Sequence, residues 1–83
     1  MITLEKLLVL LDHALSLNGR ALTFTASTPL LGSVPELDSM GVVTILTALE
    51  DQYGFSADDD EIDASTFATV GSLLRFVETK TQL

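Results

Sequence analysis

Hydrophobic residues recur with a helical spacing near the start of the chain. Thr3 is suited to cap a helix there, Glu5 places negative charge in its first turn, and Asn18-Gly19 supplies a stop after it. The pattern predicts a helix over residues 3–16. Its buried face is expected to hold the residues spaced at i, i+4, i+7 and i+11, widened by one more leucine: Leu4, Leu8, Leu11, Leu15 and Leu7.

A second helix is expected from Ser39 to Tyr53. Asp38 stands immediately before it as a cap, and Gly54 follows it as a stop. Gly41 weakens its first turn by about 1 kcal/mol relative to alanine. The side chains expected to face inward are Met40, Val43, Ile45, Leu46, Leu49 and Tyr53.

Two further helices are expected in the last third of the chain. Ser56 can cap a short helix of one to two turns that ends near Ile62. A final helix then begins at Ser65 or Thr66, with cations in its C-terminal half, where they suit the helix dipole. Its buried side is predicted to hold Phe67, Val70, Leu73, Leu74 and Val77.

The connection over residues 17–37 is long and contains glycines, prolines and a Thr/Ser-rich run. Leu22 and Phe24 alternate with small or polar residues, as in a strand, but a lone strand has no partner here. Long loops in compact domains are usually functional or disordered. Because this one is too apolar to be a free linker, we expect an ordered loop held in place by Leu22, Phe24, Leu30 and Leu31. The fold class is all-α: a single domain over residues 1–83, with three principal helices and one short one.

Composition excludes several classes of function. Twelve acidic residues against four basic ones argue against nucleic-acid binding and favour partners with basic surfaces. The chain has no cysteine and one histidine, His13, which we expect on the exposed side of the first helix. The acidic run 58–63 fails the EF-hand pattern, which needs glycine at the sixth position and glutamate at the twelfth, where this chain has Asp63 and Thr69.

The N-terminal apolar stretch is too short to cross a bilayer. It runs only from Leu7 to Leu11 before Asp12 interrupts it, and Glu5 breaks a basic leader region. We expect no membrane insertion and a cytoplasmic location.

Candidate chemistry lies at Asp38-Ser39-Met40, where the second helix is expected to begin. A phosphate attached to Ser39 would face the free N–H groups and the positive end of that helix. Serine and aspartate are also common at helix starts for capping reasons alone, so these residues by themselves assign no function.

The chain resembles an acyl carrier protein of the phosphopantetheine-binding family over nearly its whole length. Asp38-Ser39-Met40 is similar to the family's Asp-Ser-Leu attachment motif, and Glu50-Asp51 followed by Tyr53-Gly54-Phe55 is similar to the end of its second helix. The stretch from Glu61-Ile62 through 66–70 resembles the short third helix and the start of the fourth.

The resemblance implies that a phosphopantetheinyl transferase attaches 4'-phosphopantetheine to the Ser39 hydroxyl. The thiol of the arm would carry acyl groups as thioesters, received from a loading ligase or synthase and passed to acyl-transferring enzymes. Asp38 would cap the helix and help the transferase to recognise the site, and Met40 would anchor the first turn against the core. The chain would be a monomeric carrier and not an enzyme.

One departure bears on the partners. Carriers of fatty acid synthesis usually have acids in the first half of the second helix, whereas this chain has none before Glu50. We therefore expect dedicated partners, recognised more by apolar contact than by charge, with Val42, Val43, Glu50 and Asp51 as candidate contacts. The segment 35–40 and Thr47-Ala48-Leu49-Glu50 resemble stand-alone carriers of bacterial exopolysaccharide and exosortase systems.

Other functions remain open at this stage. A peptidyl or aminoacyl carrier of a nonribosomal-type pathway would share the fold and the serine. An unmodified helical protein-interaction module with the carrier fold is the alternative from another class. A serine esterase is the remote third, because neither a base nor an oxyanion site is identified.

Overall fold

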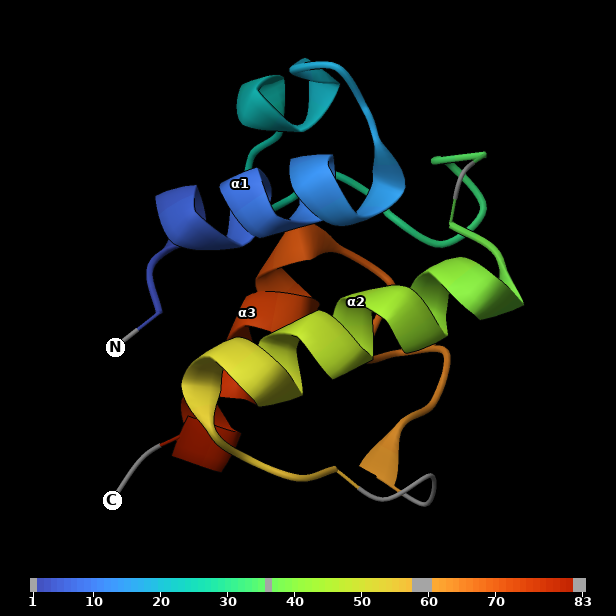
Figure 1. Cartoon of the computed structure of the whole chain (residues 1–83). Helices are drawn as coiled ribbons and strands as arrows, with labels where there is room; N and C mark the ends of the chain where they lie inside the picture. The colour runs from blue at the N-terminus through green and yellow to red at the C-terminus, as the bar shows by residue number, and fades with distance from the viewer. Residues whose placement is uncertain (1, 36, 58–60, 82–83) are drawn as a thin grey trace.

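The computed structural model describes residues 2–35, 37–57 and 61–81 and contains three α-helices (Figure 1). These are α1 (Leu4–Leu15), α2 (Ser39–Tyr53) and α3 (Val70–Thr81), and a 3-10 helix, η1 (Arg20–Thr23), follows α1. No strand occurs among these residues, although Pro29 and Thr69 form an isolated bridge. The all-α prediction is confirmed.

Helix α1 begins and ends close to the predicted positions. Thr3 caps it by accepting a hydrogen bond from the Lys6 N–H at 3.2 Å. Leu7, Leu8 and Leu11 are buried as expected, and Leu10 is buried with them. The helix ends at Ser16, which adopts a left-handed conformation with φ 53°, three residues earlier than the predicted Gly19 stop.

Three left-handed residues then reverse the chain into η1, and Asp12 holds that turn in place. Its Oδ1 accepts hydrogen bonds from the backbone N–H groups of Gly19 at 2.9 Å and Ala21 at 3.2 Å, and its Oδ2 accepts from Gly19 at 3.1 Å. Ser16, Asn18 and Gly19 all have positive φ, and for Gly19 the value is 90°. The sequence pattern gave no sign of this role for Asp12.

The rest of the connection to α2 is an ordered loop, but only part of its predicted anchoring is right. Leu30 is buried as predicted and Phe24 is partly buried, whereas Leu22 and Leu31 are 56% and 43% exposed. The expectation for Leu22 and Leu31 is wrong because the loop is held by other means. Four more apolar residues of the connection enter the core, Leu17, Ala21, Val34 and Leu37, and backbone hydrogen bonds hold the loop as well.

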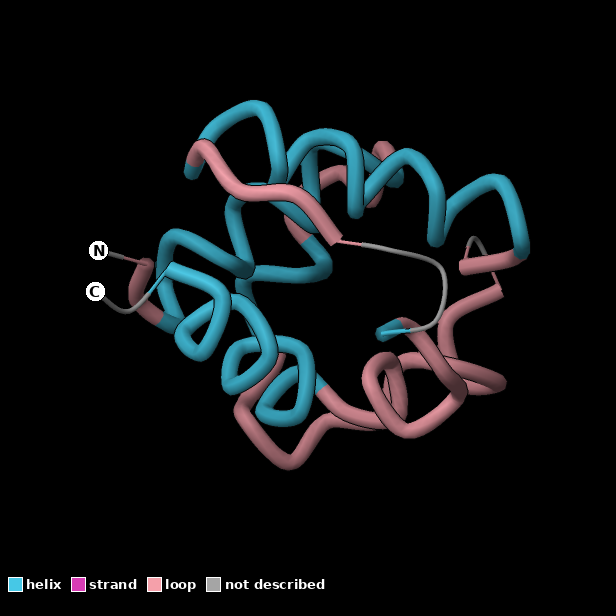
Figure 2. The backbone as a smooth tube through the Cα atoms, turned by 90° about the horizontal axis from the view of Figure 1, so that it is seen from below, coloured by secondary structure: helices cyan, strands magenta, loops and turns pink. Residues whose placement is uncertain are grey.

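Those backbone bonds join the loop to the segment before α3. The N–H groups of Leu30 and Leu31 donate to the carbonyls of Ala68 and Phe67, and the N–H of Gly71 donates to the carbonyl of Ala26 at 2.7 Å. Figure 2 shows the loop residues gathered beside the three helices. The two long connections therefore stabilise each other.

The last helix starts later than predicted. It begins at Val70 and not at Ser65 or Thr66, since Thr69 and Ser72 cap it reciprocally through two backbone-to-hydroxyl bonds of 3.1 Å. Ahead of it, Asp63 accepts bonds from Ser65 and Thr66, and the Ser65 hydroxyl contributes most to a lowered pKa of that carboxyl group. The prediction of a short helix from Ser56 to Ile62 includes residues 58–60, outside the described residues.

The core lies between the three helices. Phe67, Val70, Leu73 and Val77 are fully buried as predicted, and Leu74 is partly buried. From α2, the buried residues are Gly41, Ile45 and Leu49. Burial of leucine-sized side chains of this kind contributes about 1.5–3 kcal/mol each.

Candidate functional site

Hydrogen bonds before and after Ser39 hold the start of α2 in place. Asp38 has an extended backbone and its Oδ1 accepts the N–H of Gly41 at 2.8 Å, while its carbonyl accepts the N–H of Val42 at 2.9 Å. Just before it, Leu37 is buried and its N–H bonds to the carbonyl of Val34 at 2.9 Å. The capping role predicted for Asp38 is confirmed.

Ser39 is the first residue of α2 and is exposed to solvent. Among the described residues, none hydrogen-bonds its hydroxyl, and none accepts the backbone N–H of Ser39 or of Met40. Asp38 accepts the N–H groups of the next two residues, Gly41 and Val42. The N–H groups of Ser39 and Met40 therefore remain as donors at the positive end of the helix. A phosphate ester on Ser39 fits this position, because those N–H groups and the helix dipole both favour an anion.

Met40 does not pack against the core as predicted. Its side chain is 72% exposed, and Val43, also predicted to face inward, is 57% exposed. At about 100° per residue, both point away from the direction set by Ile45 and Leu49. The first turn is anchored instead by the buried Gly41 and by the Asp38 cap.

The four candidate partner contacts lie in different environments. Val43 and Asp51 are exposed, whereas Val42 is partly buried against the core. Glu50 is also partly buried, and its Oε2 accepts the N–H of Ala57 at 2.8 Å, which ties down the chain after Gly54. Of the two exposed residues, Val43 lies nearer to Ser39 in sequence.

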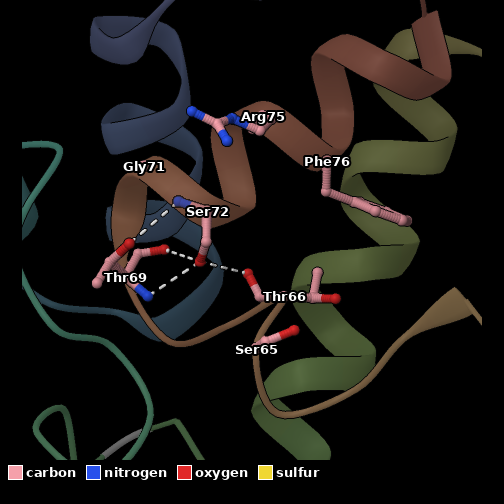
Figure 3. Close-up of a pocket in the computed structure, with 7 residues that line it drawn as sticks. All are labelled: Ser65, Thr66, Thr69, Gly71, Ser72, Arg75 and Phe76. Carbon is pink, nitrogen blue, oxygen red and sulfur yellow. Dashed lines mark hydrogen bonds between the residues drawn. The ribbon is translucent and has the colours of Figure 1, made fainter.

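A second feature, not foreseen from the sequence, is a cavity of about 550 Å³ beside the start of α3 (Figure 3). The hydroxyl groups that line the cavity are used in local hydrogen bonds: the Ser72 hydroxyl is placed to donate to the carbonyl oxygens of Thr66 and Thr69, each 2.9 Å away. Phe76, which also lines it, stands edge-on to Phe55 with ring centroids 6.4 Å apart. The Thr69-x-x-Ser72 spacing is the sequence signal for this cap. The lining residues are Ser65, Thr66, Thr69, Gly71, Ser72, Arg75 and Phe76.

Nothing resembling a catalytic or metal centre accompanies Ser39 in the described part of the chain. No group of three His, Asp or Glu side chains there is placed to hold a metal ion. His13 is exposed on α1, as expected, and Asp38 is engaged by Gly41. Within the same ranges, no helix has the length and apolar character required to span a membrane.

Comparison with known proteins assigns this arrangement to a class. Residues 9–77 match the family described as phosphopantetheine attachment site, and the chain therefore belongs to that family. No curated protein sequence gives a significant match.

A solved structure narrows the class to the acyl carrier proteins. The chain is similar to the holo acyl carrier protein of Nitrosomonas europaea, determined by solution NMR, with 55% identity over 96% of both chains and a TM-score of 0.87. The fold and function are those of an acyl carrier protein, a class of non-catalytic carriers, and the cofactor is covalently attached 4'-phosphopantetheine. The thiol of that group carries acyl chains as thioesters.

Proposed function

We propose that Ser39 is the residue that receives the phosphopantetheine arm. The observation that carries the proposal lies at the N-terminus of α2: the exposed Ser39 hydroxyl and the N–H groups of Ser39 and Met40 have no hydrogen-bond partner among the described residues. The exposed Ser65, by contrast, donates hydrogen bonds to the Asp63 carboxylate from both its N–H and its hydroxyl.

Ser39 acts in this proposal as the substrate of a phosphopantetheinyl transferase. Its Oγ attacks the phosphorus next to the pantetheine of coenzyme A, forming a phosphodiester while the pyrophosphate bond breaks and adenosine 3',5'-bisphosphate leaves. The hydroxyl proton goes to a base of the transferase, since the carboxylate of the preceding residue, Asp38, caps the helix. The chain supplies a rigidly placed nucleophile and an anion-stabilising helix end.

The arm then delivers acyl groups to partner enzymes that dock near Ser39. A tether raises the local concentration of the cargo at a docked enzyme without adding contacts to the carrier. Because α2 has no acid before Glu50, we infer dedicated partners in a specialised pathway, with Val43 and Asp51 as exposed contacts. Val42 and Glu50 are partly buried, so they would affect partner binding mainly by shaping the surface around these contacts.

Intact-mass measurement tests the attachment residue. The purified chain is incubated with coenzyme A and a broad-specificity transferase, and the mass gain is compared for wild type, Ser39→Ala and Ser33→Ala. Ser33 is an exposed serine of the preceding loop and is the matched control. We expect one phosphopantetheine on wild type and Ser33→Ala and none on Ser39→Ala. A gain that survives in a folded Ser39→Ala variant refutes the proposal.

A further inference from the structure

The turn between α1 and η1 contains an asparagine directly followed by a glycine. Asn18 is exposed, and its side-chain amide hydrogen-bonds to no other described residue. Its φ of 55° lies in the left-handed region that asparagine tolerates, and Gly19 continues the turn with φ 90°. Gly19 has no side chain to shield its backbone nitrogen. Such a pair is chemically labile, because asparagine is among the residues that degrade spontaneously in proteins.

The reaction open to this pair is deamidation through a cyclic imide. The backbone nitrogen of Gly19 attacks Cγ of Asn18, so that a bond forms between these two atoms and the Cγ–Nδ2 bond breaks. Nδ2 leaves as ammonia with the proton of the Gly19 N–H. Water then adds to either carbonyl of the imide, which opens to aspartate or to isoaspartate. Solvent reaches the turn, since Asn18 lines a surface hollow of about 230 Å³ with Asp12, His13 and Ser16.

The carboxylate of Asp12 opposes the first step of this reaction. Its Oδ1 and Oδ2 accept the N–H of Gly19 at 2.9 and 3.1 Å, and Oδ1 also accepts the N–H of Ala21 at 3.2 Å. Before it can attack Asn18, the Gly19 nitrogen has to leave these bonds, lose its proton and turn toward Cγ. Hydrogen bonds to a charged acceptor are roughly twice as strong as neutral ones. The nearby negative charge also disfavours the deprotonated nitrogen.

We propose that Asn18 is a site of spontaneous deamidation and that Asp12 protects it while the domain is folded. The proposal is independent of Ser39 and of the arm. Isoaspartate would add a methylene group to the backbone and displace the Gly19 N–H from Asp12. Either product would add one negative charge beside that carboxylate, on a chain whose net charge is already −8. Asp12 therefore guards the turn against chemical ageing as well as holding it in place.

Peptide mapping by mass spectrometry tests this protection on the full chain. Folded wild type and its variants are incubated in mildly alkaline buffer, and conversion of Asn18 to aspartate and isoaspartate is followed over time. Wild type unfolded in guanidinium chloride gives the unprotected rate. Asp12→Ala should react at least about tenfold faster than folded wild type, because its Gly19 N–H has lost both acceptor oxygens. Asp12→Asn keeps the Oδ1 acceptor without the charge and should react at an intermediate rate.

The variant Leu49→Ala separates the role of the carboxylate from a general loss of stability. Leu49 is fully buried on α2, so its truncation weakens the domain without touching the turn. Folded Leu49→Ala should react within about threefold of wild type, because the turn opens locally. If it reacts as fast as Asp12→Ala, folding in general protects Asn18 and the proposal is overturned.

Two further results would also refute the protection. One is a folded wild type that reacts at the rate of the unfolded chain. The other applies if Asp12→Ala does not fold: Asp12→Asn then provides the comparison, and a rate equal to that of folded wild type shows that Asp12 does not protect Asn18.

Discussion

Asp12 is predicted to be a main structural determinant of the turn between α1 and η1. Its carboxylate is the acceptor for two backbone N–H groups, those of Gly19 and Ala21, at distances of 2.9–3.2 Å. Ala21 is fully buried, so water cannot replace the lost acceptor at that residue. Asp12→Ala therefore leaves two donors unsatisfied in a turn that already contains left-handed Ser16 and Asn18.

The expected loss of stability follows from these contacts. A buried donor left without an acceptor costs about 1–3 kcal/mol, and the N–H of the partly exposed Gly19 costs less because water can reach it, so Asp12→Ala should lower the free energy of unfolding by about 2–4 kcal/mol. For a domain of this size, such a loss lowers Tm by roughly 10–30 °C. Asp12→Asn keeps the Oδ1 acceptor, which serves both N–H groups, and should cost about 1 kcal/mol.

Urea denaturation followed by circular dichroism measures these differences. Asp51→Ala is the control for charge, because it removes an exposed helical carboxylate from the same acidic chain and should change stability by less than about 0.5 kcal/mol. If Asp12→Ala is no less stable than Asp51→Ala, the turn does not depend on the carboxylate. The reasoning from hydrogen bonds would then be wrong.

Three further substitutions test the packing and the caps by the same denaturation assay. Leu49→Ala should cost about 2–5 kcal/mol because Leu49 is fully buried, and a loss close to zero would show that the core face of α2 is misassigned. Asp38→Ala should cost about 0.5–2 kcal/mol as a lost cap, while Ser39→Ala should stay within about 1 kcal/mol of wild type. Gly71→Ala should lower the stability by about 1–3 kcal/mol, because the added Cβ would lie 2.9 Å from the Ala26 carbonyl oxygen. Alanine has the better helix propensity, so a more stable variant would contradict that close approach.

Helices α1 and α2 were predictable because their signals are local. Asp38 before an apolar run and Gly54 after it define both ends of α2, and the structure has those ends. Helix α1 was predictable for the same reason, with leucines at helical spacing. Capping and periodicity need only neighbouring residues, which a sequence displays directly.

The inward face of α2 was not predictable in the same way. Most residues from Met40 to Leu49 are apolar or small, so several faces of the helix satisfy a hydrophobic pattern equally well. The choice is made by tertiary packing: Ile45 and Leu49 meet the core, and Met40 and Val43 are left in solvent. Two residues expected in the core are therefore exposed on the surface of α2.

The connections were the least predictable part of the fold. The start of α3 depends on bonds that join Leu30 and Leu31 to Ala68 and Phe67, residues far apart in sequence. The function of Asp12 likewise depends on where Gly19 and Ala21 come to lie. Contacts of this kind leave no periodic pattern, although Thr69 and Ser72 do have the spacing of a capping pair.

The most direct test of the central proposal is to locate the arm within the chain. Wild-type protein is modified with coenzyme A and a broad-specificity transferase, and fragment-ion mass spectrometry then identifies the residue that has gained phosphopantetheine. We expect the whole gain on Ser39, with folding unchanged by circular dichroism. A gain on any other residue, or no gain on folded protein with an active transferase, would contradict the assignment of Ser39.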